Sequence, residues 1–184
     1  MNKHPMPSLW SAPATLLGLD GHCGLLTAWV ALRHFHRRTS SAKLVRACGY
    51  SCEDGIFSVA LACALHDHGL EVTFYTDPDL AMQPAEQPFY SRASSLGILV
   101  QPAAALDVLI AQVAAGRLPI VLYYTPEGGT HFSILTGSSP DAVQFHDEGE
   151  LSRQTFEQGW NTPDTLRQTV IVGSSSRTPA TPNK

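Results

Sequence analysis

The chain carries, at residues 21–35, the stretch GHCGLLTAWVALRHF. Its apolar residues recur at helical spacing, which predicts a buried helix that begins at the Gly-His-Cys-Gly turn. Cys23 then lies in the first helical turn, where unpaired backbone N–H groups and the positive end of the helix dipole favour a thiolate over a thiol. Gly21 and Gly24 let other groups approach the sulfur closely. Cys23 is therefore the candidate nucleophile, and the competing interpretation is a small apolar residue packed beneath a helix.

The composition is that of a globular protein. With 184 residues, 43% of them hydrophobic and 15% charged, the chain is long enough to bury a core as a single domain. The formal net charge is −4 and no basic run occurs, which argues against nucleic-acid and membrane partners. No secretory leader and no membrane-spanning apolar run is recognisable, so we expect a cytoplasmic protein. There the four cysteines, Cys23, Cys48, Cys52 and Cys63, would remain reduced thiols.

Helices are predicted early in the chain and antiparallel strands late, which is the order of an α+β protein. After the first helix, the sequence predicts a short helical turn over 42–47, a helix that begins at a capping box in Ser51–Asp54 and ends at Gly69, and further helices over 106–115 and 152–160. Strands are predicted over 70–76, 119–124, 131–136, 142–146 and 168–172. We expect residues 77–102 to form a long loop with one helical turn near Tyr90.

The domain organisation follows from the same patterns. Residues 1–14, rich in proline, are expected to form a flexible arm. Residues 15–172 would then be a single domain, and residues 173–184, a Ser/Thr/Pro-rich segment, a disordered tail.

A second group of chemically active residues lies in the late strands. His131 opens a strand directly after a Gly-Gly turn, and Asp147 lies sixteen residues later, in the next strand-like run. If the two runs pair as a hairpin around residues 138–141, His131 and Asp147 lie side by side. A carboxylate in that place orients an imidazole, which in turn activates a thiol.

These motifs resemble the C39-like group of papain-fold cysteine peptidases. The resemblance rests on Cys-Gly at the head of an apolar helix, Gly-x-His-Phe-x-Ile-Leu-x-Gly over 129–137, Asp147, and Ser-x-x-x-Phe-x-x-x-Trp over 152–160. It is closest to the branch related to guanylyl cyclase domain-containing proteins, through the segments 53–62, 87–90 and 156–164. It covers roughly residues 15–172.

The resemblance implies a papain-like fold, with N-terminal helices packed on a C-terminal antiparallel sheet. It implies that Cys23 is the nucleophile, His131 the general base and Asp147 the residue that orients His131. We also expect Gly129 and Thr130, directly before His131, to contact the substrate.

One position departs from the family pattern. Active members carry a Gln six residues before the cysteine, whose side-chain amide stabilises the oxyanion, and this chain has Leu17 there. Loss of one such donor typically lowers the rate by roughly 100- to 1000-fold. The source of a second donor is therefore open.

Two function classes follow. The first is a cysteine-dependent hydrolase that acts on a peptide, amide or thioester through an S-acyl intermediate on Cys23, or an acyl or aminoacyl transferase with the same nucleophile. The second is a catalytically degenerate papain-fold module that binds a peptide or another ligand. No cofactor is implied. A zinc site at Cys48, Cys52 and Cys63 is disfavoured, because structural zinc sites pair their ligands more closely. By strand alternation, Glu148 is expected to point away from His131.

Overall fold

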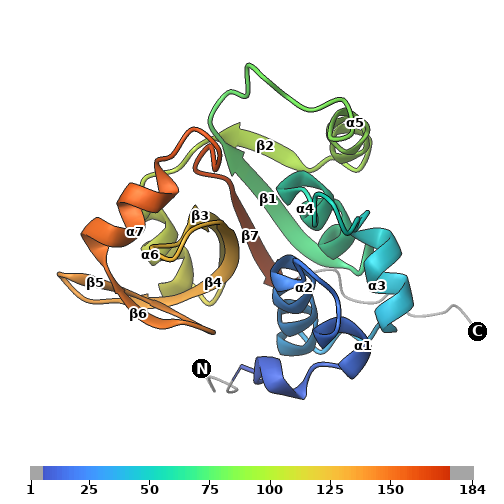
Figure 1. The fold of residues 1–184 in the computed structure, drawn as a ribbon, viewed down its shortest axis with the longest axis horizontal. Coiled ribbons are helices and arrows are strands. Elements are labelled where there is room, and N and C mark those ends of the chain that lie inside the picture. The colour runs from blue at the N-terminus through green and yellow to red at the C-terminus, as the bar shows by residue number, and fades with distance from the viewer. Residues whose placement is uncertain (1–5, 175–184) are drawn as a thin grey trace, which may run out of the picture.

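The computed structural model describes residues 6–174 and is organised around one twisted sheet (Figure 1). The strands stand in the order β2-β1-β7-β3-β4-β5-β6. Among these strands only β1 and β2 pair in parallel. Their bounds are β1 (Leu70–Thr76), β2 (Leu99–Pro102), β3 (Leu118–Tyr124), β4 (Thr130–Ser138), β5 (Ala142–Phe145), β6 (Gly149–Ser152) and β7 (Thr169–Ser174).

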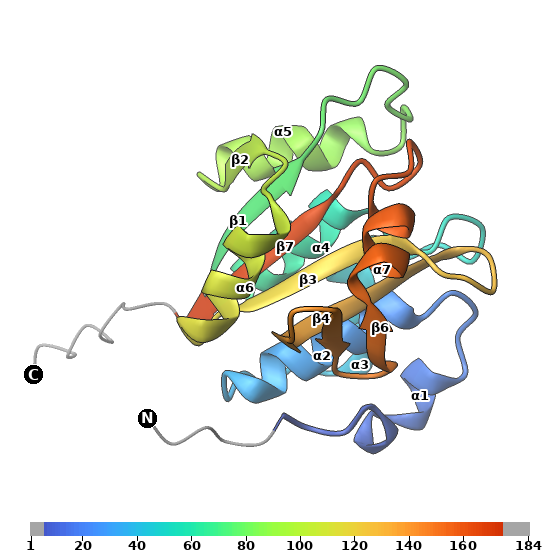
Figure 2. The ribbon, with the colours of Figure 1, turned by 90° about the vertical axis from the view of Figure 1, so that its left-hand side faces the viewer.

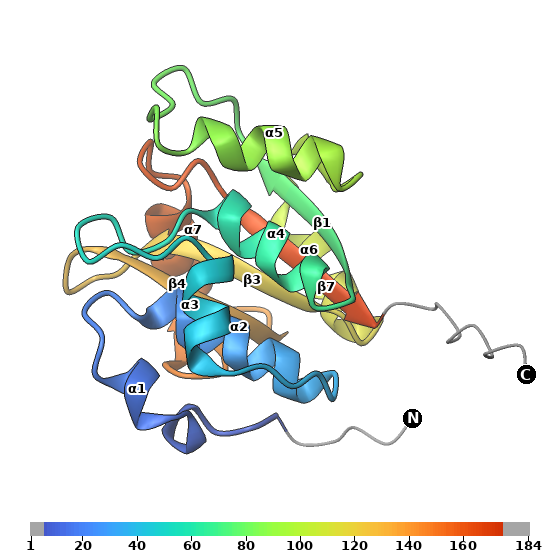
Figure 3. The same cartoon turned by 90° about the vertical axis from the view of Figure 1, so that its right-hand side faces the viewer.

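Helices cover both faces of the sheet. The helical elements are η1 (Leu9–Ser11), a 3-10 helix, and the α-helices α1 (Ala14–Leu17), α2 (Cys23–His34), α3 (Ser41–Ala47), α4 (Ser58–Asp67), α5 (Gln87–Ser95), α6 (Leu106–Ala114) and α7 (Arg153–Trp160). The N-terminal helices α2 and α4 lie on one face (Figure 3), and α6 and α7 lie on the other (Figure 2). The predicted α+β class is confirmed. Within residues 6–174, no helix combines the length and apolarity needed to cross a membrane.

Strand alternation divides the core into two clusters. In β3, Ile120 belongs to the cluster beneath α2 and α4, whereas Val121 and Tyr123 belong to the cluster beneath α6 and α7. The second cluster is aromatic: the ring of Tyr123 stacks on Phe145 at 5.3 Å and meets Phe156 edge-on at 5.4 Å. The sheet is thus the middle of three layers, and β4 is packed between α2 on one face and α6 on the other.

Two predictions of local structure are wrong. Residues 51–55 do not start a helix; they form a tight turn in which Ser51 and Gly55 pair, and Ser51 Oγ accepts the Asp54 N–H. A Ser side chain bonds to the backbone in turns as readily as at a helix start, so the motif alone does not distinguish the two. The segment 77–102 is not one loop, because it contains α5 and β2. The described structure also contains β6, which the sequence analysis did not predict.

The ends of the expected domain lie partly in regular structure. Residues 9–14, expected in the N-terminal arm, include η1 and the start of α1, and Ala12 is buried in the first core cluster. Gly173 and Ser174, expected in the tail, belong to β7. The remainder of the expected tail (175–184) and residues 1–5 lie outside the described residues.

Gly159 fixes how closely α7 approaches β3. A Cβ added at Gly159 would lie 2.0 Å from the carbonyl oxygen of Tyr124, a backbone atom. We expect Gly159→Ala to lower the free energy of unfolding by about 1–3 kcal/mol, because the strand or the helix must shift. Urea unfolding followed by circular dichroism measures the effect. Gln158→Ala, an exposed neighbour in α7, is the control, and equal stability of the two variants would contradict this packing.

Candidate active site

Cys23 is the first residue of α2, as predicted. The preceding turn contains Gly21 at φ 57°, a backbone conformation that glycine adopts without strain. A Cβ at Gly24 would lie 2.4 Å from Ile56 Cδ1 and 3.0 Å from Phe132 Cδ2. The glycine after the cysteine therefore lets the helix start approach β4, which carries the candidate base.

His131 and Asp147 are in direct contact. His131 Nε2 lies 2.7 Å from Asp147 Oδ2, and the Ser133 hydroxyl donates a hydrogen bond to the other carboxylate oxygen. The register explains the geometry: Leu135 pairs with Phe145 across β4 and β5. Continuing it past the strand end brings Asp147 opposite Ser133, one pleat from His131 on the same face.

Cys23 and His131 line the same pocket, and each shifts the pKa of the other. Burial raises the pKa of the Cys23 thiol, but the hydrogen bond with His131 and the backbone N–H groups of Phe132 and Gly24 lower it, and the net pKa is below that of a free cysteine. Burial lowers the pKa of His131, whereas Asp147 and Cys23 raise it, to about 10. Between these two pKa values the pair is a thiolate and an imidazolium.

Asp147 is the anionic end of the chain of hydrogen bonds. Burial raises the pKa of its carboxyl group, and the hydrogen bonds from His131 and Ser133 outweigh this and lower it. Because Nε2 of His131 is engaged by Asp147, Nδ1 is the nitrogen that remains for Cys23.

The prediction for Glu148 is wrong. Asp147 and Glu148 lie in the turn between β5 and β6, where strand alternation does not apply. Glu148 Oε1 lies 3.6 Å from His131 Nε2, and the same side chain accepts a hydrogen bond from the Tyr123 hydroxyl. His131 thus faces two carboxylates, of which Asp147 is the closer.

The position of the missing amide is apolar. Leu17 lines a small pocket of about 190 Å³ beside Cys23, together with Leu9 and Leu26. The same pocket reaches His131 and Asp147. Among the described residues that line it, none carries a side-chain amide.

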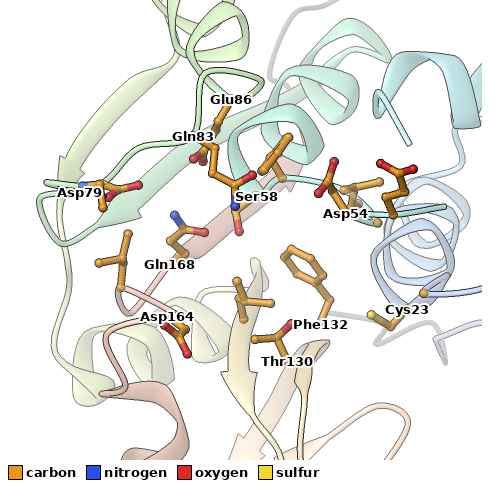
Figure 4. Close-up of a pocket in the computed structure, with 18 of the residues that line it drawn as sticks. Cys23, Asp54, Ser58, Asp79, Gln83, Glu86, Thr130, Phe132, Asp164 and Gln168 are labelled. Carbon is orange, nitrogen blue, oxygen red and sulfur yellow. Dashed lines mark hydrogen bonds between the residues drawn. The ribbon is translucent and has the colours of Figure 1, made fainter. Parts of the chain in front are cut away.

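The two expected substrate contacts differ in position. Thr130 lines a cleft of about 570 Å³ that begins at Cys23 (Figure 4). Gly129 is exposed in the β3–β4 turn and is not among the residues that line the cleft. No local sequence pattern predicted the residues of the far walls of this cleft, among them Ser58, Glu86 and Gln168, which come from segments distant in the sequence.

The other cysteines differ from Cys23. Cys48 and Cys63 are buried, and burial raises the pKa of Cys48 to about 12 and raises that of Cys63. Cys52 is exposed in the turn before α4. Within residues 6–174 there is no group of three or more His, Cys, Asp or Glu side chains placed to hold a metal ion.

Comparisons with known proteins support the fold. No protein-family model matches this chain, and no curated protein matches it. Among solved structures, the chain is similar to a double glycine motif protease from an AMS/PCAT transporter, determined in complex with the leader peptide. The two share 14% sequence identity over 94% of each chain, with a TM-score of 0.53.

The fold is therefore that of a C39-type peptidase domain, as predicted from the sequence. The protease of the transporter is one protein with this fold, and at this identity the likeness concerns the fold. None of the comparisons matches the guanylyl cyclase-related branch, which stays a prediction.

Proposed function

We propose that this protein is a cysteine-dependent hydrolase that cleaves a peptide, amide or thioester through an S-acyl intermediate on Cys23. The observation that carries the proposal is that Cys23, His131 and Asp147 line one pocket, in which His131 Nε2 lies 2.7 Å from Asp147 Oδ2. Nucleophile, base and orienting carboxylate in this order are what acyl transfer to a thiol requires. The fold, shared with a double glycine motif protease, supports the same chemistry.

The reaction would run in two steps. The Cys23 thiolate attacks the carbonyl carbon and forms a C–S bond. The His131 imidazolium then gives its proton to the leaving amine or thiolate as the scissile bond breaks. In the second step, His131 takes a proton from water as the oxygen attacks the acyl carbon, and the C–S bond breaks. The carboxylic acid leaves, and the thiolate and imidazolium are restored.

A peptide is the first substrate class to test, because the similar protease was solved with its leader peptide. A transferase would use the same Cys23 chemistry but a nucleophile other than water. A binding module would keep the cleft without turnover, and the apolar Leu17 is the observation that favours it. We further expect a cytoplasmic protein whose cysteines are thiols.

The proposal predicts that Cys23 is the most reactive of the four thiols. Limited iodoacetamide labelling near neutral pH, read by mass spectrometry, is expected to modify Cys23 first. Its thiolate forms below the usual cysteine pKa, whereas Cys48 and Cys63 are buried with raised pKa values. As the pH falls from 9 to 7, Cys23 labelling should decline less than that of a free thiol such as glutathione, because the pKa is lowered.

His131→Ala provides the test of the mechanism. Without the imidazolium, the pKa of Cys23 is expected to rise, so labelling at neutral pH slows and regains the steep pH dependence of an ordinary thiol. Exposed Cys52 is the internal control, because its labelling should be equal in both proteins. Faster labelling of Cys52 than of Cys23 in the unaltered protein would contradict the proposal.

A further inference from the structure

The cleft that begins at Cys23 is enclosed by segments from distant parts of the chain. One wall is the start of β4, with Thr130 and Phe132, and the opposite wall is made by residues 52–58 and 79–86. Figure 4 shows Glu86, Gln83 and Ser58 across the cleft from Thr130 and Phe132, with Cys23 at one end. The loop of residues 163–168 closes the side away from Cys23.

The charge of this cleft is of one sign. Five carboxylates line it, and no Lys, Arg or His does so among the described residues. None of the five forms an ion pair with another part of the described structure. They are Glu53, Asp54, Asp79, Glu86 and Asp164. A cleft lined by one sign of charge concentrates ligands of the opposite sign.

Two buried side chains of the cleft have polar groups for which residues 6–174 provide no hydrogen-bond partner. Glu86 is 5% exposed, and no described residue forms a hydrogen bond with its carboxylate. Burial, and then the charge of Asp79, raise the pKa of this carboxyl group. Ser58 is 2% exposed, and its hydroxyl oxygen has no hydrogen-bond partner within the described part of the chain. Buried polar groups are normally hydrogen-bonded, so this pair indicates a site that a ligand completes.

The neighbouring arginine does not neutralise the cleft. Arg167 donates two hydrogen bonds to Asp77, of 2.7 Å and 2.6 Å. The pair joins the loop after β1 to the loop before β7, and the residues on either side of Arg167, Leu166 and Gln168, line the cleft. Arg167 therefore holds two walls together while its charge is satisfied by Asp77.

From these observations we propose that the cleft binds a positively charged side chain of a peptide substrate, a guanidinium or ammonium group, with Glu86 and Asp79 as its counter-charges and Ser58 as a hydrogen-bond acceptor. This deepens the proposed function, since it takes Cys23 as the nucleophile to which the bound peptide is delivered. The carboxylates are distributed along the cleft and do not converge into a metal-binding group within the described residues. That distribution suits an extended basic peptide better than a single metal ion.

The first experiment measures selectivity at Cys23. The probes are short peptidyl acyloxymethyl ketones in which arginine, citrulline or glutamate is placed in turn at each position. They react with the full chain, and intact-mass spectrometry gives the rate of adduct formation on Cys23. Citrulline has nearly the shape of arginine without its charge. We expect arginine to react at least about tenfold faster than citrulline at one or more positions, as for a hydrogen-bonded charge. Glutamate should react slowest, and added salt should reduce the differences.

Substitutions assign the preference to the cleft. The double variant Glu86→Gln and Asp79→Asn is expected to lose most of the arginine preference, measured as the ratio of the arginine rate to the citrulline rate. Glu157→Gln, an exposed carboxylate of α7 outside the cleft, is the matched control and should keep the preference. A thermal melt of each variant checks that it is folded. If the double variant does not fold, Glu86→Gln alone replaces it, because this substitution removes a buried unpaired charge at nearly constant shape.

The second experiment separates this inference from the proposed function. Fluorescence anisotropy measures the binding of labelled oligoarginine and oligocitrulline peptides to Cys23→Ala, which needs no reaction. Arginine-selective binding without any Cys23 adduct in the first experiment would overturn the proposed function and retain the cationic cleft. Cys23 adducts at equal rates for arginine and citrulline, together with equal binding of the two peptides, would overturn the cleft inference and retain the nucleophile.

Discussion

Asp147→Asn is expected to lower the rate of Cys23 acylation by about 10⁴-fold while the fold is kept, by analogy with triad enzymes. The carboxylate lies 2.7 Å from His131 Nε2 and has a pKa below its ordinary value, so it is an anion at neutral pH. An asparagine has the same shape and no charge. It neither stabilises the imidazolium nor selects the tautomer that presents Nδ1 correctly to Cys23.

The pH dependence gives a second readout of the same change. Asp147 is one cause of the raised pKa of His131, about 10, so its loss lowers that pKa. A thiolate without an imidazolium partner is less stable, so the pKa of Cys23 rises. The range of pH in which the thiolate–imidazolium pair exists becomes narrower from both ends. The alkylation rate of Cys23 against pH is therefore expected to shift its inflection upward.

Glu148→Gln is the matched control for Asp147→Asn. It removes the second carboxylate facing His131, which lies at 3.6 Å and is engaged by the Tyr123 hydroxyl. We expect the acylation rate to fall by much less than in Asp147→Asn. Acylation rates on a panel of peptidyl thioesters, with circular dichroism to verify folding, measure both variants. If Glu148→Gln had the larger effect, the orienting role would belong to Glu148.

The elements that carry Cys23 and His131 could be predicted because their signals are local. The helix of Cys23 follows from an apolar periodicity that begins at a glycine turn, and α2 begins at that residue. Strands β3 to β5 follow from short apolar runs divided by Gly-rich and Ser/Pro/Asp turns, and the predicted hairpin of β4 and β5 is confirmed.

Elements defined by tertiary contacts could not be predicted in the same way. The helix α5 is polar, and tertiary contacts stabilise it: Ala93 is buried, and Phe89 and Tyr90 pack against the core. Pro88 lies in the first turn of this helix, where proline is tolerated. The strand β2 has exposed Leu99 and is defined by its parallel pairing with β1.

The site shows the same division. Spacing brought His131 and Asp147 together, but the strand-like pattern was extended beyond Phe145, where β5 ends, and so misplaced Glu148, which lies in a turn. The acidic cleft could not be predicted, because its carboxylates lie far apart in the sequence, from Glu53 to Asp164. In the sequence, each of these residues is an ordinary Asp or Glu of the kind found on protein surfaces, and only the fold brings them into one cleft.

In the proposed reaction, the pocket beside Cys23 is where the oxyanion would be stabilised. When a carbonyl is attacked, negative charge develops on its oxygen, and the backbone N–H groups at the start of α2 supply part of the stabilisation. Leu17 occupies the position from which related enzymes are expected to donate an amide, and its pocket is lined by Leu9 and Leu26 as well. A leucine donates no hydrogen bond, so the donor expected at this position is absent.

Leu17→Gln is therefore expected to raise the rate of Cys23 acylation by thioester and anilide probes, by up to about 100-fold, the lower end of what one oxyanion donor contributes. Alkylation by iodoacetamide is the internal control: it displaces iodide at a saturated carbon and develops no oxyanion, so its rate should not change. Leu17→Met, which keeps the pocket apolar at similar volume, is the matched variant and should leave both rates unchanged. If the folded Leu17→Gln variant is acylated at the same rate, the missing amide does not limit the reaction. The same conclusion follows if acylation is slower, as expected for a polar amide placed in an apolar pocket. In that case the oxyanion is stabilised by another group, and Leu17 belongs to the substrate-binding surface.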